Sequence, residues 1–203
     1  SGFVELAAKA LNDPHFGINW ALSLPRDFRS SGPNLILAMT VRDLQQLLNM
    51  AIQYQLIHTN VFQYAYREDP SEHTLRGEVS LHPLSRQSLH CLEHVTSVIV
   101  QMGRMYVPGL TINPGRFKHR PLGDISFYEK AFGCPVEFNA NRTEIIAPVE
   151  ALKIKLGNRA SVGKPILRGY LNYHLSKVQK KYDSVGLSVS GALVSMLGVQ
   201  TSN

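Results

Sequence analysis

The fold of this chain is decided by residues 121–138, which read PLGDISFYEKAFGCPVEF. Tyr128 and Phe132 lie four positions apart, so they share one face of a short helix. Gly133 suits the left-handed residue that ends a helix, and Pro135 prevents the helix from continuing. The residues that we expect to build this joint between a helix and a strand are Asp124, Tyr128, Phe132, Gly133, Pro135, Val136 and Phe138.

Hydrophobic periodicity on either side of this stretch predicts both helices and strands. Helical spacing occurs over residues 3–10, 16–24, 40–56, 85–105, 165–182 and 188–199. Alternation over residues 61–66 and 75–81 predicts an antiparallel hairpin, and further strands are expected over 110–119, 136–138 and 144–147. The hairpin and the absence of regular βαβ alternation predict an α+β fold, with an antiparallel or mixed β-sheet packed with several α-helices.

The helix over residues 40–56 carries the clearest start signal. The Thr40 hydroxyl is the expected N-cap, with the Asp43 carboxylate three residues later. After it, one apolar stripe is formed by Leu44, Leu47, Leu48, Ala51, Ile52 and Leu56. We interpret this stripe as hydrophobic core and not as a groove for a partner.

Length and composition favour a single globular domain in a reducing compartment. The chain has 203 residues, of which 44% are hydrophobic and 18% charged. Its two cysteines, Cys91 and Cys134, are too few for a disulfide framework. No apolar run has the ~20 residues that span a bilayer, and no export signal is present. We therefore expect a soluble cytoplasmic protein with no membrane partner.

Positive charge is concentrated towards the C-terminus. The net charge is +6, and residues 153–181 contain basic side chains but no acid. A solvated helix face is the simplest interpretation, with phosphate groups or an acidic partner as the alternative. Residues 153–181 contain no recognition motif for nucleic acid, so we do not expect this segment alone to bind it.

One short motif suggests metal chemistry. His90-Cys91-Leu92-Glu93-His94 fits H-x-x-E-H, in which two histidines hold Zn²⁺ and the glutamate activates water. The motif needs a third ligand that the sequence does not nominate, and chance pairing explains it more simply. No nucleophile elbow, P-loop or dinucleotide fingerprint occurs. We predict no catalytic residue, no metal, no cofactor and no enzymatic activity.

Residues 121–138 also resemble the pattern P-x-x-D-x-x-x-Y-x-x-x-F-G-x-P-V-x-F of the N-terminal effector domain of AraC-type bacterial transcription regulators, a group whose label refers to arabinose binding. Supporting pieces in the same order are Asp13-Pro14-His15-Phe16-Gly17, residues 52–60, Asn141-Arg142-Thr143 and Ile145-Ile146. The resemblance implies a domain over residues 3–182 that binds a small-molecule effector. It implies that residues 183–203 are a linker and the start of a connecting helix to a helix-turn-helix DNA-binding domain, which is absent from this chain.

The resemblance leaves the effector and its site open. Aromatic side chains with polar tips, and one cation, are the candidate ligand-binding residues: Trp20, Tyr64, Tyr66, Tyr106 and Arg168. The basic excess favours a carboxylate-bearing effector over a neutral sugar. We also expect a homodimer, and contact with DNA only through the missing domain. The alternatives are a dimerisation module without a ligand and a zinc hydrolase that uses His90, Glu93 and His94.

Overall fold

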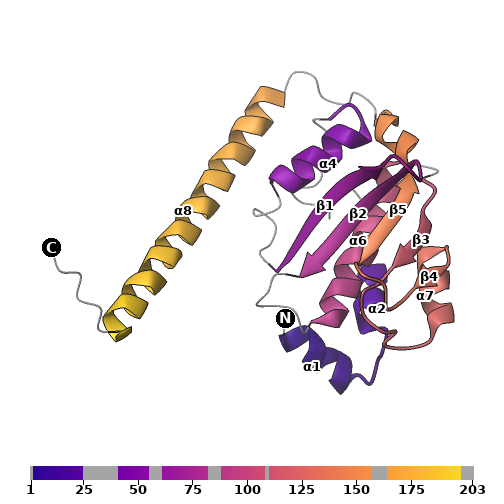
Figure 1. Ribbon diagram of the computed structural model, residues 1–203, viewed down its shortest axis with the longest axis horizontal. Coiled ribbons are helices and arrows are strands. Elements are labelled where there is room, and N and C mark those ends of the chain that lie inside the picture. The colour runs from indigo at the N-terminus through magenta and orange to yellow at the C-terminus, as the bar shows by residue number, and fades with distance from the viewer. Residues whose placement is uncertain are drawn as a thin grey trace.

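The computed structural model describes residues 2–24, 41–54, 61–81, 88–107, 110–156 and 164–197. Its elements are α1 (Gly2–Ala10), α2 (Phe16–Ser23), α4 (Leu44–Gln53), β1 (Phe62–Asp69), β2 (Thr74–Leu81), α6 (Leu89–Tyr106), β3 (Asn113–Arg116), α7 (Ile125–Phe132), β4 (Val136–Glu137), β5 (Glu144–Pro148), the 3-10 helix η3 (Val149–Lys153) and α8 (Lys164–Leu197). The predicted α+β class is confirmed (Figure 1).

The strands form one mixed sheet in the order β1-β2-β5-β3-β4. The predicted hairpin is present, with Tyr64 opposite Val79 and Tyr66 opposite Gly77 in antiparallel register. The β2–β5 and β3–β5 pairs are also antiparallel, whereas β3 and β4 are parallel. Because side chains alternate along each strand, this register places one apolar set of residues on one face of the sheet.

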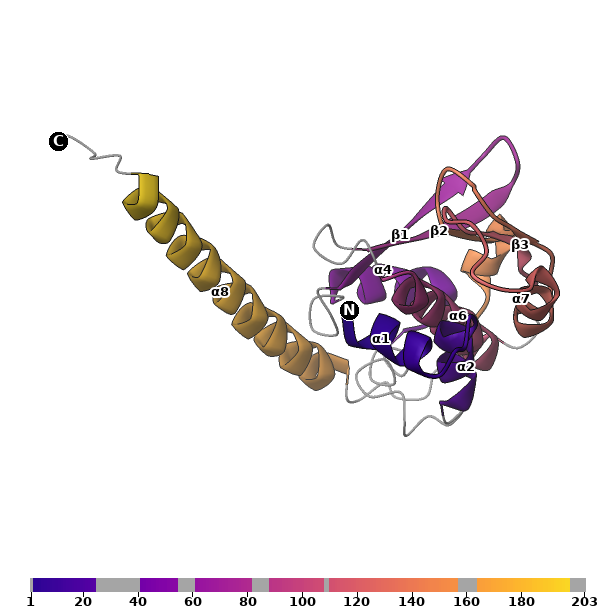
Figure 2. The ribbon, with the colours of Figure 1, turned by 90° about the horizontal axis from the view of Figure 1, so that it is seen from below.

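The helices α1, α2, α4 and α6 cover that same face of the sheet (Figure 2). The short helices α1 and α2 pack on α6. The closest approach is at Gly17, where an added Cβ atom would lie 2.1 Å from the His90 carbonyl oxygen. A residue without a side chain is therefore required at this helix crossing.

Residues 121–138 fold as a helix followed by a short strand. The Asp124 carboxylate accepts a hydrogen bond from the Ser126 backbone N–H (3.0 Å) at the start of α7. Gly133 ends the helix with a φ of 66°, in the left-handed region. Tyr128 and Phe132 are buried in an aromatic cluster with Phe117. The stretch is thus a joint that fastens α7 to the core.

This joint meets residues 13–17, the other distant piece of the family pattern. The Asp124 backbone N–H donates to His15 Nε2 (3.2 Å), and the His15 ring stacks on Phe127 with centroids 4.1 Å apart. An added Cβ at Gly123 would lie 2.5 Å from His15 Nε2. Two segments more than 100 residues apart in sequence are therefore in direct contact.

The start of α4 and the length of β3 differ from the sequence predictions. Asp43 is the N-cap of α4, because its side chain accepts from the Gln46 backbone N–H, while Thr40 and Leu56 lie outside the described residues. The third strand covers only Asn113–Arg116 and is shorter than the predicted 110–119, and its pairing with β5 has a register shift between Asn113 and Arg116.

The C-terminal helix is also longer than predicted. Residues 164–197 form one continuous helix, α8, in place of two separate helices. Leu171 is buried against Val41, Met50 and Tyr54, and the Tyr54 hydroxyl donates to Asn172 Oδ1 (2.6 Å). Beyond this contact, α8 extends away from the rest of the molecule (Figures 1 and 2).

The predicted apolar face of α8 is correct only in part. Leu171 is buried, and His174, Leu175 and Val178 are half-buried. Ile166 and Tyr170, however, are exposed, since α8 contacts α4 along a narrow strip. No helix in the described part of the chain combines the length and the hydrophobicity needed to cross a membrane.

Candidate ligand-binding site

A cavity of about 260 Å³ lies between the sheet, α4 and α6. We call it the central cavity. It is lined by Leu44, Leu47, Leu48, Ala51 and Ile52 of α4, Phe62, Tyr64, Ala65 and Tyr66 of β1, Leu75, Gly77, Glu78 and Val79 of β2, Val95, Val98, Ile99, Val100, Met102 and Gly103 of α6, and Leu110, Ile112, Ile145 and Ala147.

The β-sheet forms one wall of the central cavity. On β2, Leu75, Gly77 and Val79 face the cavity, and Gly77 is paired with Tyr66 on one side and Ile145 on the other. An added Cβ at Gly77 would have only the Ile145 carbonyl oxygen within 4 Å, at 3.7 Å. The missing side chain at Gly77 therefore contributes space to the cavity and no strain.

Two tyrosines of β1 connect the sheet to α4 by hydrogen bonds. The Tyr64 hydroxyl donates to the Ala51 carbonyl oxygen (2.8 Å), and the Tyr66 hydroxyl donates to Asn49 Oδ1 (2.7 Å). Burial raises the pKa of Tyr64 to about 12, so its hydroxyl remains a proton donor at neutral pH. The rings line the cavity while their polar tips are bonded to α4.

The apolar stripe of α4 also lines the central cavity. Leu44 is buried as predicted, but Leu47, Leu48, Ala51 and Ile52 are only half-buried and line the central cavity. The stripe packs in the core, as predicted, and the cavity wall is a further role that the sequence did not indicate. An apolar stripe looks the same in sequence whether it packs against side chains or around a void.

The structure brings together two of the five residues expected to bind a ligand. Tyr64 and Tyr66 lie side by side in the cavity wall. Trp20 instead stacks on His94 with ring centroids 3.8 Å apart, and Arg168 is exposed on α8. The side chain of Tyr106 lies outside the described part of the structure. The wall residues that the sequence reasoning missed include Leu48, Gly77, Val98 and Met102. Of these, only Gly77 gives a signal in the sequence, as a glycine at an inward position of a strand.

A second hollow, of about 820 Å³, lies beside the start of α6 and is lined by Glu78, Lys118, His119, Arg142 and neighbouring residues. Its Glu78 and Arg142 side chains form an ion pair with each other. Most small-molecule sites are apolar with a few polar groups. The central cavity fits that description better.

Of the two histidines of the H-x-x-E-H motif, His90 lies near the Glu93 carboxyl group, whereas His94 stacks on Trp20. Glu93 is fully buried, accepts from the Tyr128 hydroxyl (2.7 Å), and has His90 Nδ1 at 3.9 Å and His119 Nε2 at 3.8 Å. Burial raises the pKa of Glu93 to about 8. Among the described residues, no group of three or more His, Cys, Asp or Glu side chains is arranged so that it could hold a metal ion. A carboxyl group closed off from solvent is poorly placed to activate water, so the geometry does not support the hydrolase alternative.

The two cysteines are free and half-buried. Burial raises the pKa of the Cys91 thiol, which keeps it protonated and unreactive.

The family model for the arabinose-binding domain of AraC transcription regulator, N-terminal, matches residues 1–156. This chain belongs to that family. The family is defined by a role in transcription regulation and not by a reaction, so the chain is a regulatory sensing domain. No curated protein matches the sequence.

The fold of this AraC-family domain is similar to that of a solved regulator. The transcriptional regulator CdpR from Pseudomonas aeruginosa superposes with a TM-score of 0.65 at 16% identity. The match covers 81% of this chain and 54% of CdpR, so the chain spans about half the length of that regulator.

Proposed function

We propose that this AraC-family domain binds a small-molecule effector in the central cavity and transmits its presence through α8. The observation that carries this proposal is the position of α4. One side of this helix lines the cavity, and the other side packs against α8. A ligand that favours one position of α4 therefore favours one position of α8.

The contact between α4 and α8 is small but specific. Leu171 is 1% exposed and packs on Met50, while Asn172 accepts the hydrogen bond of the buried Tyr54. The buried Leu171 and the hydrogen bond from Tyr54 are therefore the contacts through which a shift of α4 would reach α8.

The sensing part is proposed to extend over residues 3–182, and residues 183–203 to lead towards a DNA-binding domain outside this chain. The continuous helix α8 crosses this boundary, which supports a mechanical connection. In the full regulator, contact with DNA would come from that other domain, in the cytoplasm. Trp20, Tyr106 and Arg168 remain candidates for accessory contacts, but the cavity lining favours Tyr64 and Tyr66.

The test is a thermal-shift screen of small molecules against the wild-type chain, a Gly77→Val variant and a Gly115→Ala control. Valine at Gly77 fills the cavity, whereas a Cβ at Gly115 meets no atom within 4 Å. We expect effectors that raise the Tm of the wild type and of Gly115→Ala but not of Gly77→Val. Failure of every compound class, or binding that Gly77→Val leaves intact, contradicts the proposal.

Transmission is tested by hydrogen exchange. Bound effector should change the exchange of residues 164–175 in the wild type, and this change should be smaller in Asn172→Ala, which lacks the acceptor for Tyr54. Unchanged exchange in α8 on binding would show that the cavity and α8 are not coupled.

Self-association is a second proposed function, supported by exposed apolar side chains on α8. Ile166, Tyr170 and Tyr173 are 77%, 53% and 55% exposed. Large exposed apolar groups of this kind often mark interfaces. We expect a homodimer by light scattering for the wild type and a monomer for the double variant Tyr170→Ser, Tyr173→Ser. An equal mass for the two proteins would contradict a dimer through this face.

A further inference from the structure

We propose that the central cavity is specific for an uncharged, apolar ligand and rejects sugars and carboxylates. This inference rests on the proposed function and names the chemical class of its effector. It is argued from the size of the cavity, from the hydrogen bonds of its polar groups and from the position of the charged side chains.

Size limits the ligand but does not decide its chemistry. A cavity of roughly 150 Å³ lined by aliphatic and aromatic side chains holds benzene, so 260 Å³ holds about ten carbon atoms on the same scale. A bicyclic aromatic compound or a medium-length alkyl chain fits this volume. A pentose has a similar number of non-hydrogen atoms, and therefore its hydroxyl groups decide whether it binds.

The polar groups of the cavity wall are already used by the protein. The hydroxyls of Tyr64 and Tyr66 are bonded to α4. Glu78 is the one charged residue in the described part of the lining. Its carboxylate is paired with Arg142, and alternation along β2 directs Gly77 and Val79 to the cavity and the Glu78 side chain to the opposite face. A bound sugar would lose hydrogen bonds to water for several hydroxyls. The two tyrosine oxygens, whose protons are already donated to α4, can accept and so replace only a few of them.

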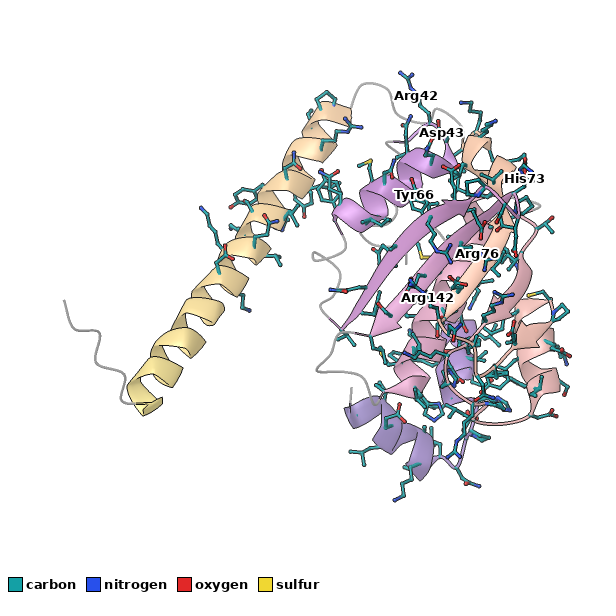
Figure 3. The ribbon with its side chains drawn as sticks, in the orientation of Figure 1. Arg42, Asp43, Tyr66, His73, Arg76 and Arg142 are labelled. Atoms are coloured by element: carbon teal, nitrogen blue, oxygen red, sulfur yellow. The ribbon has the colours of Figure 1, made fainter. Side chains whose placement is uncertain are left out.

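Charged side chains lie on the other face of the sheet. Arg76 is bonded to Asp69, Glu72 and Glu144. Figure 3 shows Arg76 and Arg142 in front of the sheet, with α6 behind it. Among the described residues that line the central cavity there is no lysine, arginine or histidine. A ligand carboxylate would be buried there without a counter-charge. The cavity thus gives no support to the sequence-based preference for a carboxylate effector.

The experiment compares four probes that separate charge and hydroxyl groups from size. Naphthalene is the apolar probe, and L-arabinose is the sugar of matched size. 2-Naphthoate adds a carboxylate to the same rings, and 2-isopropylnaphthalene, an uncharged analogue of the same size as 2-naphthoate, controls for the added volume and should bind if charge alone excludes 2-naphthoate. Binding is measured by thermal shift and by titration calorimetry on the full chain. The proteins are the wild type, Gly77→Val and the Gly115→Ala control, and circular dichroism checks that each variant is folded.

We expect naphthalene near saturation to raise the Tm of the wild type and of Gly115→Ala by about 5 °C. Gly77→Val should show no rise, and neither arabinose nor 2-naphthoate should shift any of the proteins. If arabinose or 2-naphthoate binds and Gly77→Val abolishes that binding, the ligand class is wrong while the proposed function stands. If no probe and no screened compound binds, both the inferred ligand class and the proposed function are contradicted. Binding of naphthalene that Gly77→Val does not weaken also overturns the inference, because it places the probe elsewhere.

Discussion

Glu93 shows at the scale of a single residue how the fold changes the chemistry of a side chain. Its carboxyl group has no exposed surface, and three groups approach it: the Tyr128 hydroxyl, His90 and His119. Burial is the main reason why its pKa rises from 4.5 to about 8, with a smaller contribution from Glu5 and an opposing one from Tyr128. The native state therefore holds Glu93 protonated at neutral pH.

This shift predicts a loss of stability as the pH rises. Below pH 4.5, Glu93 is protonated in both the folded and the unfolded chain, so its contribution to stability is complete. Between pH 4.5 and about 8 only the unfolded chain releases the proton, which lowers the free energy of unfolding by up to about 1.4 kcal/mol per pH unit.

Glu93→Gln should remove this contribution, since glutamine keeps the oxygen that accepts from Tyr128 and cannot ionise. Urea unfolding from pH 4.5 to 8 measures the difference between variant and wild type. His94 and His119, whose pKa values burial lowers, act in the opposite direction and are the same in both proteins. A difference that does not grow with pH contradicts the assignment.

Tyr128 is the second residue at which burial sets the energetics. Its hydroxyl donates to Glu93 and accepts from the Leu122 backbone N–H (3.2 Å). Tyr128→Phe leaves both partners unsatisfied and should lower the free energy of unfolding by about 1–3 kcal/mol. Tyr173→Phe, which removes a hydroxyl from a residue that is 55% exposed, is the control and should have an effect within about 0.5 kcal/mol. Equal effects of the two variants would show that the hydrogen bonds of the Tyr128 hydroxyl do not contribute to stability.

At the scale of elements, the close packing of α2 against α6 depends on one glycine, Gly17. Alanine generally stabilises a helix relative to glycine by about 0.5–1 kcal/mol. Gly17→Ala should nevertheless destabilise the protein by about 1–3 kcal/mol, because the new Cβ would lie 2.1 Å from the His90 carbonyl oxygen.

The matched control is Gly169→Ala, on α8, where an added Cβ meets no atom within 4 Å. It should stabilise the protein or leave it unchanged. Thermal unfolding of the two variants should therefore give shifts of opposite sign. Two shifts of the same sign would mean that α2 can move off α6 at little cost.

Helix α4 makes contacts with three different parts of the molecule. Its N-cap residue Asp43 also forms an isolated β-bridge with Lys155, its apolar stripe lines the central cavity, and its far side holds α8 through Met50 and Tyr54. These contacts give the helix a defined position. A ligand must therefore alter contacts of α4 to be sensed, as the proposed function requires.

At the scale of the whole molecule, a dense aromatic core and a cavity lie at different places against the same sheet. The core around Phe117, Tyr128 and Phe132 fastens α7 and α2, while the central cavity lies under β1, β2 and α4. We infer that the first provides rigidity and the second provides the binding site. The two share Val100, Ile112 and Ile145 at their border, but Phe117, Tyr128 and Phe132 lie outside the cavity wall. We therefore expect changes at these three aromatic residues to alter stability without altering ligand binding.

Phe117→Leu tests this separation. Phe117 is 1% exposed and does not line the central cavity. The variant should lose about 1–3 kcal/mol of stability through the void left in the core. Its affinity for naphthalene, measured by titration calorimetry, should equal that of the wild type. A matching loss of affinity would show that core and cavity act as one unit.

The sequence by itself determined the family and most local elements, the exceptions being the start of α4, the length of β3 and the continuity of α8. The hairpin, the short helix that Gly133 ends and the α+β class follow from periodicity and from backbone preferences, which act between near neighbours in the chain. The pattern over residues 121–138 could be read because its residues must satisfy local geometry, such as the left-handed φ at Gly133.

Only the tertiary structure decided which apolar residues surround a void. Leu48, Val98 and Gly77 come from three elements, and nothing in their sequence spacing distinguishes a cavity wall from a packed core. Trp20 and Arg168 have side chains of types that bind ligands, but the fold places Trp20 against His94 and Arg168 on the exposed surface of α8. A cavity arises from the difference between the volume that the elements enclose and the volume that their side chains fill, and that difference exists only after the chain has folded.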